Sequence, residues 1–541
     1  MVKLTIDQVP AEVHEGMTIL EAAASAGIVI PTMCFHDGCT NHPSCMICLV
    51  KEIERDQLVP SCAMPVADGM NILTNSDEVR EARKDALELL LSDHVGDCEA
   101  PCRVSCPAFM DIPLMNRLVA AGDFDRALAI VREEIALPLV LGYICPAPCE
   151  KACKRKPMDA AVSICLLKRA TAVHCEGSCI PTGQADWNGK RIAVIGTGPA
   201  GLSAAYYLLL SGYACVLFDA REKAGGMMRY SIPDEVLPKE VLDAEILAIA
   251  RMGGEFRMNT TISRDYFQEV ILPGYDAIIL ATGHREQDPG TIFGLPPDKT
   301  GSFIDRKDLS TGVPGVFACG NIIREQKMAV QSVAHGKAAA IGVIRYIENT
   351  GGRLAQQKNK QDAGPSMSEG LKRHSVSVTG HLFEPEWQEY LQESILDHRV
   401  EPAGGKSAGF TRGEAMHEAK RCLHCDCRKP VSCKLRMYAD EYGAQRRKFA
   451  GPDRRRLSRS MQHETVVYET EKCIRCGLCI EIAEQHGEVT GLTFAGRGFD
   501  VRITIPFNET IREALQKAAA DCVQSCPTGA LAFKTAEERN K

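Results

Sequence analysis

The sequence lacks the features that mark membrane, secreted or nucleic-acid-binding proteins. No apolar run approaches the length of a bilayer span. The first residues, MVKLTIDQVPAEVHEGMTI, contain no apolar signal-peptide core and predict a strand hairpin instead. A formal charge of −7 over 541 residues is too mild to indicate a nucleic-acid-binding surface. We therefore expect a cytoplasmic protein with no membrane span and no nucleic-acid partner.

The sequence has one residue type in excess, because it contains 25 cysteines. With 45% hydrophobic and 25% charged residues, the chain has ordinary core material and needs no disulfide staples. Thiols of a large cytoplasmic protein stay reduced, and close cysteine spacings favour metal binding. Zinc sites and iron–sulfur clusters each need about four ligands. We expect several metal-binding cysteine sets in a multidomain chain of α/β and α+β class.

Residues 1–75 predict a small β-grasp domain with a binuclear cluster. KLTID and AEVHE alternate as paired strands do, and Thr18 with Glu21 forms a capping box before the short helix ILEAAASAG. The loop that follows carries four cysteines separated by ten, two and thirteen residues: Cys34, Cys45, Cys48 and Cys62. Thiolates are soft donors suited to the iron of a [2Fe–2S] cluster. A zinc loop is the alternative, but zinc sites usually show two short CxxC-type pairs and this loop has one.

This region also resembles a known family. PTMCFH, SCMICLV and VPSCAMPVADGM are similar to the N-terminal [2Fe–2S] domain of the iron–sulfur subunit of complex I-type NADH dehydrogenases, and of related hydrogenases and formate dehydrogenases. The resemblance assigns ligand roles to the same four cysteines and leaves Cys39 as a bystander. It continues through LELLLSDHVGDC, where that family has a cluster with a histidine ligand, and His94 matches this position. After Cys98 the spacing departs from the family.

A second resemblance begins where the first one ends. The segment from CEAPCRVSC to CEKACKR resembles the N-terminal domain of the glutamate synthase small subunit, a module also found in dihydropyrimidine dehydrogenase and bifurcating transhydrogenases. It implies a helical domain over residues 76–185 with two [4Fe–4S] clusters, whose ligand loops are separated by the helix DFDRALAIVREE. The resemblance places Cys106, Cys145 and Cys149 on one cluster, and Cys98, Cys102 and Cys153 on the other.

Each of these two sets lacks one ligand. His94, four residues before Cys98, is our candidate for one gap, because neutral imidazole is a competent iron ligand. For the other gap the family often uses Gln or Glu from a helix. The nearest match is Lys168, which is a poor ligand, so we assign Cys165, one helical turn earlier. A thiolate at this position makes a cluster harder to reduce, because it adds negative charge.

Residues 186–350 predict a Rossmann-like domain. KRIAVIGTGPAGLSAAYYLLLSGYACVLFDARE has the pattern strand, glycine turn, helix and strand. Gly196, Gly198 and Gly201 allow the backbone to approach a pyrophosphate at a helix N-terminus, and Asp219 ends the second strand, where an acid holds a ribose hydroxyl.

Four segments of this domain resemble the FAD half of the glutamate synthase small subunit: GPAGL, AGGMMRYSIPDEVLPKEVLDAEI, DAIILATGH and TGVPGVFACGNI. Asn321 stands where that family normally has Asp. The resemblance implies that the FAD site also includes Pro199, Ala200, Gly225, Gly226, Thr282, Gly283, Gly320 and Asn321.

One domain of those relatives is missing from this sequence. Full-length relatives insert a second GxGxxG domain, for NADPH, between the ATG and PGVFA segments. Here only Gly283 to Pro314 lies between them, without a glycine fingerprint, and a βαβ unit needs about thirty residues or more. We therefore expect an FAD site without its usual nicotinamide domain and a nucleotide site on a partner. The alternative is that NADPH binds the remaining fingerprint instead of FAD.

Residues 351–460 predict a polar linker followed by a compact cysteine set. GGRLAQQKNKQDAGPSMSEG has linker composition. FTRGEAMHEAKRCLHCDC resembles the C-terminal tail of glutamate synthase small subunit-like proteins. The spacing predicts either a [4Fe–4S] cluster or zinc held by Cys422, Cys425, Cys427 and Cys433.

Residues 461–541 predict a ferredoxin-like domain. EKCIRCGLC and CVQSCPTGAL form a bacterial ferredoxin signature. Ala483 and Ala519 stand where a second cluster would need cysteines, so one cluster remains. Its predicted ligands are Cys473, Cys476, Cys479 and Cys526.

Together these features predict an electron-transferring iron–sulfur flavoprotein subunit with FAD, a [2Fe–2S] cluster and three or four [4Fe–4S] clusters. It would belong to a multi-subunit NAD(P)H- or ferredoxin-linked oxidoreductase, and the resemblances include electron-bifurcating members. They imply three partners: an FMN-binding, NADH-oxidising subunit, a thioredoxin-like [2Fe–2S] subunit and ferredoxin. Three alternatives stay open: a self-sufficient NADPH oxidoreductase of glutamate synthase small-subunit type, a catalytic formate or hydrogen subunit, for which no motif is visible, and a non-enzymatic assembly scaffold.

Overall fold

The computed structural model divides the chain into two compact units, and neither unit is one continuous segment. Unit 1 contains Met1–Ala100, Arg373–Ser394 and Leu423–Lys541, and unit 2 contains Pro101–Lys372 and Ile395–Cys422. The five consecutive domains expected from the sequence therefore remain a prediction. The structure describes residues 1–40, 42–177, 185–283, 289–297, 303–305, 308–350, 376–380, 382–392, 394–451 and 455–534.

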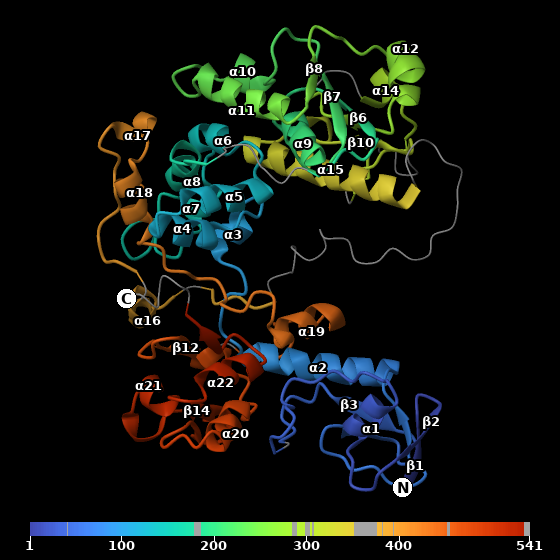
Figure 1. Ribbon diagram of the computed structural model, residues 1–541, viewed down its shortest axis with the longest axis vertical. Coiled ribbons are helices and arrows are strands. Elements are labelled where there is room, and N and C mark those ends of the chain that lie inside the picture. The colour runs from blue at the N-terminus through green and yellow to red at the C-terminus, as the bar shows by residue number, and fades with distance from the viewer. Residues whose placement is uncertain are drawn as a thin grey trace. The chain divides into compact units, whose positions relative to one another are not determined.

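The N-terminal part of unit 1 is a mixed five-stranded sheet with one short helix (Figure 1). The sheet has the order β2-β1-β5-β3-β4, and β1 and β5 are its parallel pair. The capping box predicted at Thr18 and Glu21 is confirmed, because both reciprocal hydrogen bonds are present. The elements are β1 (Val2–Ile6), β2 (Val9–Val13), α1 (Ile19–Ser25), β3 (Leu49–Glu52), β4 (Gln57–Pro60) and β5 (Asn71–Leu73).

The rest of unit 1 consists of a long helix and short elements from the C-terminal part of the chain. Ser76 caps α2 (Asp77–Asp93), which ends at His94. One small antiparallel sheet has the order β11-β12-β15, and β13 pairs with β14. The further elements are α16 (Glu384–Leu391), α19 (Lys434–Tyr442), β11 (Arg459–Ser460), β12 (Val466–Glu469), η3 (Thr470–Lys472), α20 (Leu478–Gln485), β13 (Thr493–Ala495), η4 (Gly498–Asp500), β14 (Arg502–Thr504), η5 (Pro506–Asn508), α21 (Ile511–Ala514), α22 (Ala519–Ser525) and β15 (Leu531–Phe533).

Unit 2 begins with short helices that share a buried apolar core. The side chains of Asp111 and Asp123 cap α4 and α5, so the predicted helix DFDRALAIVREE starts at its aspartate. Two further helices return to this group from the later segment of the unit. The helices are α3 (Pro101–Ser105), α4 (Ile112–Ala120), α5 (Phe124–Glu134), α6 (Pro138–Ile144), α7 (Pro148–Lys151), α8 (Ile164–Val173), α17 (Gly405–Ala408) and α18 (Arg412–Ala419).

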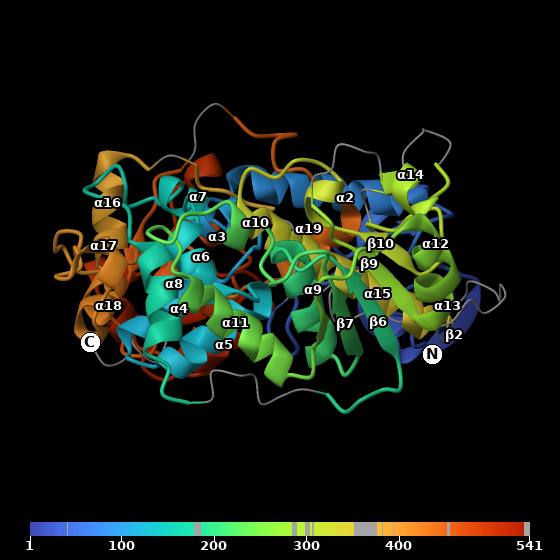
Figure 2. The same ribbon diagram turned by 90° about the horizontal axis from the view of Figure 1, so that it is seen from above.

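The remainder of unit 2 is a parallel sheet of order β10-β9-β6-β7-β8. Its strands are β6 (Arg191–Ile195), β7 (Ala214–Phe218), β8 (Glu255–Arg257), β9 (Ala277–Leu280) and β10 (Val316–Ala318). Helices α9 (Pro199–Leu210) and α15 (Ala329–Thr350) pack against each other beside this sheet (Figure 2). The other elements are α10 (Met227–Tyr230), α11 (Lys239–Arg251), α12 (Arg264–Tyr266), the π-helix η1 (Phe267–Ile271), α13 (Leu272–Gly274), α14 (Pro289–Phe293) and η2 (Gly320–Ile322).

This sheet gives unit 2 a doubly wound arrangement with a ligand crevice. Chain order reverses between β6 and β9, and parallel sheets bind ligands at the carboxyl ends of the strands at such a point. The strand, glycine turn, helix and strand predicted over residues 191–218 are all present. Among the described residues, no helix combines the length and apolar character needed to cross a membrane.

Candidate iron–sulfur and dinucleotide sites

The thiols predicted to hold a binuclear cluster lie together in unit 1: Cys34, Cys45, Cys48 and Cys62. All four are buried, and the Sγ atoms of Cys48 and Cys62 are 3.4 Å apart. The Cys34 thiol interacts with both Cys45 and Cys62, and these hydrogen bonds hold its pKa well below the usual range. The group can present four thiolates to iron. Cys39 instead lies 3.8 Å from the side-chain nitrogen of Gln485.

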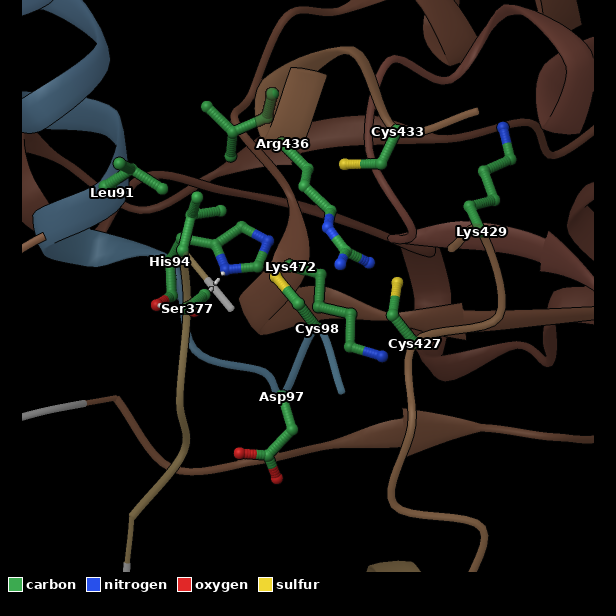
Figure 3. Close-up of a pocket in the computed structure, with 12 residues that line it drawn as sticks. Leu91, His94, Asp97, Cys98, Ser377, Cys427, Lys429, Cys433, Arg436 and Lys472 are labelled. Carbon is green, nitrogen blue, oxygen red and sulfur yellow. Dashed lines mark hydrogen bonds between the residues drawn. The ribbon is translucent and has the colours of Figure 1, made fainter. Parts of the chain in front are cut away.

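A cavity in unit 1 is lined by one imidazole and three thiols from distant parts of the sequence (Figure 3): His94, Cys98, Cys427 and Cys433. His94 is the C-cap residue of α2, and Cys433 is the N-cap residue of α19. The backbone N–H of Cys427 donates to the carbonyl of Cys98 at 3.4 Å, which holds the two loops together. Figure 3 shows the ring and the three sulfur atoms around the same hollow.

The His94 ring is oriented by Ser377. The Ser377 hydroxyl donates to the His94 carbonyl at 3.3 Å. The Ser377 oxygen therefore accepts from the N–H of His94 Nδ1, and these two heavy atoms are 3.0 Å apart. Burial lowers the pKa of His94 to about 4, which keeps the imidazole neutral near pH 7. A neutral ring with Nδ1 committed to a hydrogen bond presents Nε2 to a metal, as metal-binding histidines usually do.

Buried cations also line this cavity, and each has a buried carboxylate partner. The Arg436 guanidinium donates to Glu99 at 2.7 Å, and the Lys472 ammonium pairs with Glu469. Burial raises the pKa of Cys98 to about 11. Burial disfavours a thiolate without a partner in this cavity. The positive charge of a bound metal would stabilise the thiolates and so allow these cysteines to act as ligands.

A second cavity, in unit 2, is lined by four thiols: Cys106, Cys145, Cys149 and Cys165. A hydrogen bond with Cys165 lowers the pKa of Cys145 to about 6. Cys165 and Lys168 both point inward from α8, since both line the cavity. The sequence proposed Cys165 as the fourth ligand of this set, and the structure brings the four sulfur atoms around one hollow.

A third cavity, in unit 1, is lined by the four predicted ferredoxin-type ligands: Cys473, Cys476, Cys479 and Cys526. Burial raises the pKa of Cys473 to about 12. Cys522, which the ferredoxin pattern left over, is buried beside the set, and its Sγ lies 3.6 Å from the carbonyl of Cys479.

The three sites of unit 1 adjoin one another. Cys45 of the first set and Cys473 of the ferredoxin-type set line one cavity of about 180 Å³. The backbone N–H of Lys434, next to Cys433, donates to the carbonyl of Pro527, next to Cys526, at 2.8 Å. The first set and the His94 set therefore each have a direct structural link to the ferredoxin-type set.

The structure groups some predicted ligands differently from the sequence. Cys98 was placed with Cys102 and Cys153, and Cys427 with Cys422 and Cys425, but Cys98 and Cys427 line one cavity with His94 and Cys433. The sequence had completed the set of Cys98, Cys102 and Cys153 with His94, so the structure keeps His94 with Cys98 and changes their other two partners. No three Cys, His, Asp or Glu side chains in the described residues lie close enough to bind a single metal ion.

The glycine turn of the Rossmann-like sheet is tightly constrained. Gly196 has φ +109°, and a Cβ there would lie 2.3 Å from the carbonyl oxygen of Ala281. A Cβ at Gly201 would lie 1.9 Å from the carbonyl oxygen of Gly196. At Gly198 nothing lies within 4 Å, so the backbone before Pro199 is open to a ligand at the N-terminus of α9. Each glycine thus has the role that a dinucleotide fingerprint requires.

The other predicted dinucleotide residues surround the same strand ends. The Asp219 carboxylate accepts from the N–H of Thr197 at 2.8 Å and from that of Arg221 at 3.0 Å. Thr282 Oγ1 is buried without a hydrogen-bond partner, as a polar atom awaiting a ligand would be. Asn321 Oδ1 accepts from the Gln326 N–H at 3.2 Å.

Close packing explains further glycines of the predicted site. A Cβ at Gly226 would lie 2.7 Å from the Gly198 Cα, and one at Gly320 would lie 2.9 Å from the Ala200 Cβ. Gly225 and Gly283 have φ of +126° and +78°. The open cradle at Gly198 and the unpartnered Thr282 hydroxyl fit a bound dinucleotide.

Between Gly283 and Pro314 the described residues contain the helix α14 and isolated bridges at Ile304 and Ser310. Residues 284–288, 298–302 and 306–307 lie outside the described part. The prediction that this stretch lacks a second nucleotide domain stays a prediction.

Three family models match the chain. Residues 1–77 match a 2Fe–2S iron–sulfur cluster-binding domain, and residues 74–179 match dihydropyrimidine dehydrogenase domain II, 4Fe–4S cluster. Residues 194–254 match an NAD(P)-binding Rossmann-like domain.

Curated relatives match about a third of the chain. The NADPH-Fe(3+) oxidoreductase subunit beta of Geobacter sulfurreducens is 37% identical over 199 residues, which are 36% of this chain and 30% of the relative. The NADP(+)-dependent formate dehydrogenase subunit beta of Moorella thermoacetica is 38% identical over 207 residues, 34% of this chain and 29% of the relative. The glutamate synthase [NADPH] small chain of Bacillus subtilis is 32% identical over 227 residues, 40% of this chain and 46% of the relative.

The matches thus cover less than half the length of each of these relatives. The three family models agree with part of the sites described above, because two of them are iron–sulfur domains and the third covers the glycine cradle. The chain combines 2Fe–2S, 4Fe–4S and Rossmann-like regions, and it is similar to subunits of NADPH- and NADP-linked iron–sulfur oxidoreductases.

Proposed function

We propose that this chain is an electron-transferring iron–sulfur flavoprotein subunit of a multi-subunit NAD(P)H- or ferredoxin-linked oxidoreductase. The observation that carries the proposal is the row of three adjoining ligand sets in unit 1. Iron–sulfur clusters at these sets would supply one-electron chemistry, and their potentials depend on charge and hydrogen bonds around the sulfur atoms. The protein holds the ligands, excludes water and keeps the sites adjacent.

The proposed ligand sets follow the cavities. A [2Fe–2S] cluster is assigned to Cys34, Cys45, Cys48 and Cys62. Three [4Fe–4S] clusters are assigned to the three cavities described above. Their ligand sets are His94, Cys98, Cys427 and Cys433; Cys106, Cys145, Cys149 and Cys165; and Cys473, Cys476, Cys479 and Cys526. Cys427 and Cys433 share a cavity with His94 and Cys98, so we favour iron–sulfur over zinc for them. Cys102, Cys153, Cys422 and Cys425 remain predicted metal ligands, as the sequence assigned them.

We assign FAD to the Rossmann-like domain, because the glycine cradle and the Thr282 hydroxyl lie at the strand ends and a glutamate synthase small chain is among the relatives. FAD would couple two-electron and one-electron chemistry. NAD(P) is the second candidate, favoured by the description of the family model for residues 194–254. With FAD at this site, the nucleotide site that the relatives' names require is assigned to a partner subunit.

The names of two relatives as beta subunits support the existence of partners. An FMN-binding, NADH-oxidising subunit, a thioredoxin-like [2Fe–2S] subunit and ferredoxin are our candidates. Bifurcation is one activity such an assembly would allow. We place the protein in the cytoplasm, because reduced thiols suit that compartment and the described cysteines form no disulfide.

The test is the cofactor content of the anaerobically purified chain. We expect acid-labile sulfide, iron near that of one binuclear and three or more cubane clusters, and FAD released on denaturation. Release of NADP without flavin would favour the second candidate. Absence of labile sulfide in a well-folded preparation would contradict the proposal, and clusters without flavin would favour an assembly scaffold.

A further inference from the structure

The cavity of Cys106, Cys145, Cys149 and Cys165 contains a buried cation that has no carboxylate partner. Lys168 is only 4% exposed, and its side chain lines the cavity. Its ammonium donates one hydrogen bond, to the carbonyl of Leu141 at 3.2 Å. Within the described residues, no carboxylate lies within ion-pair distance of its Nζ.

This isolation contrasts with the other buried cations near a ligand set. Lys472 pairs with Glu469, and Arg436 pairs with Glu99. Burying an unpaired ammonium is costly, so buried charges are normally paired. The strongest electrostatic partners of Lys168 are, in order, Cys165, Cys145, Cys149 and Cys106, and the carboxylate of Glu245 is a weaker one. The main counter-charge of Lys168 therefore comes from the cavity.

We infer that Lys168 is the built-in counter-charge of an iron–sulfur cluster in this cavity and raises the reduction potential of that cluster. The inference rests on the proposed function. A cubane cluster with four thiolate ligands carries net negative charge, which increases when an electron is added. A fixed positive charge, and N–H groups directed at the sulfur atoms, stabilise the reduced state more than the oxidised state.

This role changes the interpretation of Cys165. A fourth thiolate in place of a neutral ligand would make the cluster harder to reduce, because it adds one negative charge. Lys168, one helical turn further along α8, places one positive charge at the same cavity. The pair Cys165 and Lys168 together adds no net charge, so the cluster keeps a potential at which it exchanges electrons. Lys168 is a positioning and tuning residue, not a ligand.

The test is an anaerobic redox titration of the full chain followed by electron paramagnetic resonance. Cys165→Ser identifies the spectral component of this cluster. Lys168→Met should lower the midpoint potential of that component by about 59 mV or more, a tenfold change for a one-electron couple. Lys168→Arg should keep the potential near the wild-type value. Lys151→Met, which removes the same charge from an exposed position on α7 near Cys149, should have little effect.

An unchanged midpoint in Lys168→Met with full iron content would overturn the inference. If Lys168→Met loses the cluster, retention in Lys168→Arg still supports the counter-charge, whereas loss in both variants overturns it in favour of a packing role. Failure of the proposed function would give a different result. The wild-type chain would then lack the spectral component that Cys165→Ser is expected to alter, and substitutions at Lys168 would make no difference to this.

Discussion

His94 and Cys433 are separated by more than three hundred residues in sequence and line one cavity. If they bind the same cluster, His94→Ala and Cys433→Ser should alter the same spectral component and each lower the iron content by up to about four atoms per chain. Cys422→Ser should alter a different component. The measurement is electron paramagnetic resonance of dithionite-reduced protein with iron analysis.

His42→Ala provides a matched control, because His42 is exposed, with 62% of its side chain accessible, and should leave every component unchanged. One result would contradict the grouping in the cavity: Cys433→Ser alters the spectral component that Cys422→Ser alters, and leaves intact the component that His94→Ala alters. Cys433 would then belong with Cys422, as the sequence predicted.

Residue types and local spacings were predictable, but the grouping of distant ligands was not. The four cysteines of residues 34–62 lie within one short segment. Those of the ferredoxin-type motif lie in two segments, EKCIRCGLC and CVQSCPTGAL, that together form a known signature. Cys98 has near neighbours in sequence, Cys102 and Cys106, and local spacing favoured them. The contact between the loops of Cys98 and Cys427 depends on tertiary packing, which leaves no periodic signal in the sequence.

At the scale of elements, a carboxylate joins the sheet part of unit 2 to its helical part. Glu245, on α11, accepts from the N–H groups of Leu139 and Val140 at 2.8 and 2.9 Å, at the N-terminus of α6. Figure 2 shows these helices side by side. Burial raises the pKa of Glu245 to about 7, although its hydrogen bonds oppose this. The folded state therefore retains a proton that an unfolded Glu, with pKa near 4.5, releases.

It follows that this group reduces the free energy of unfolding as pH rises from about 4.5 to about 7, by roughly 3 kcal/mol in total. Glu245→Gln should be close to wild type in thermal stability at about pH 4.5 and more stable than wild type at about pH 7.5. A difference between variant and wild type that is equal at the two pH values would refute a titrating Glu245.

The packing of α9 against α15 depends on Gly336. A Cβ at this position would lie 2.1 Å from the carbonyl oxygen of Ala200, in the first turn of α9. Gly336→Ala should therefore destabilise unit 2 by about 1–3 kcal/mol and weaken dinucleotide retention, because the helix N-terminus must shift. Thermal melts and flavin content measure both effects.

Gly413→Ala is the control for that substitution, since nothing lies within 4 Å of a Cβ at Gly413 and alanine suits its helix. It should leave stability unchanged or slightly higher. If Gly336→Ala and Gly413→Ala changed the thermal stability equally, the close contact of Gly336 with α9 would not be needed for the stability of unit 2.

Elements with clear local signals were predicted well. The helix over 124–134 starts at its aspartate cap, and the strands and helix of the glycine fingerprint appear as expected. The π-helix Phe267–Ile271 had no sequence signal, because its wider turn arises from packing and not from propensity.

At the scale of the whole molecule, the chain is built from two discontinuous units, and unit 1 collects segments from both ends of the sequence. The resemblances followed this pattern only in part, because the first region resembles one family and the middle of the chain resembles another. Local sequence patterns could not predict that Cys427 and Cys433, from the C-terminal segment of unit 1, complete the cavity of His94.

The central proposal is that this chain transfers electrons through its clusters and flavin and exchanges them with a nucleotide site on a partner. The direct test is an anaerobic titration of the isolated chain with NADH, NADPH and then dithionite, following flavin bleaching and cluster absorbance. We predict that dithionite reduces both chromophores and that neither nucleotide does. Bleaching of the flavin by NADPH alone would contradict the account, because it would place a working nucleotide site in this chain.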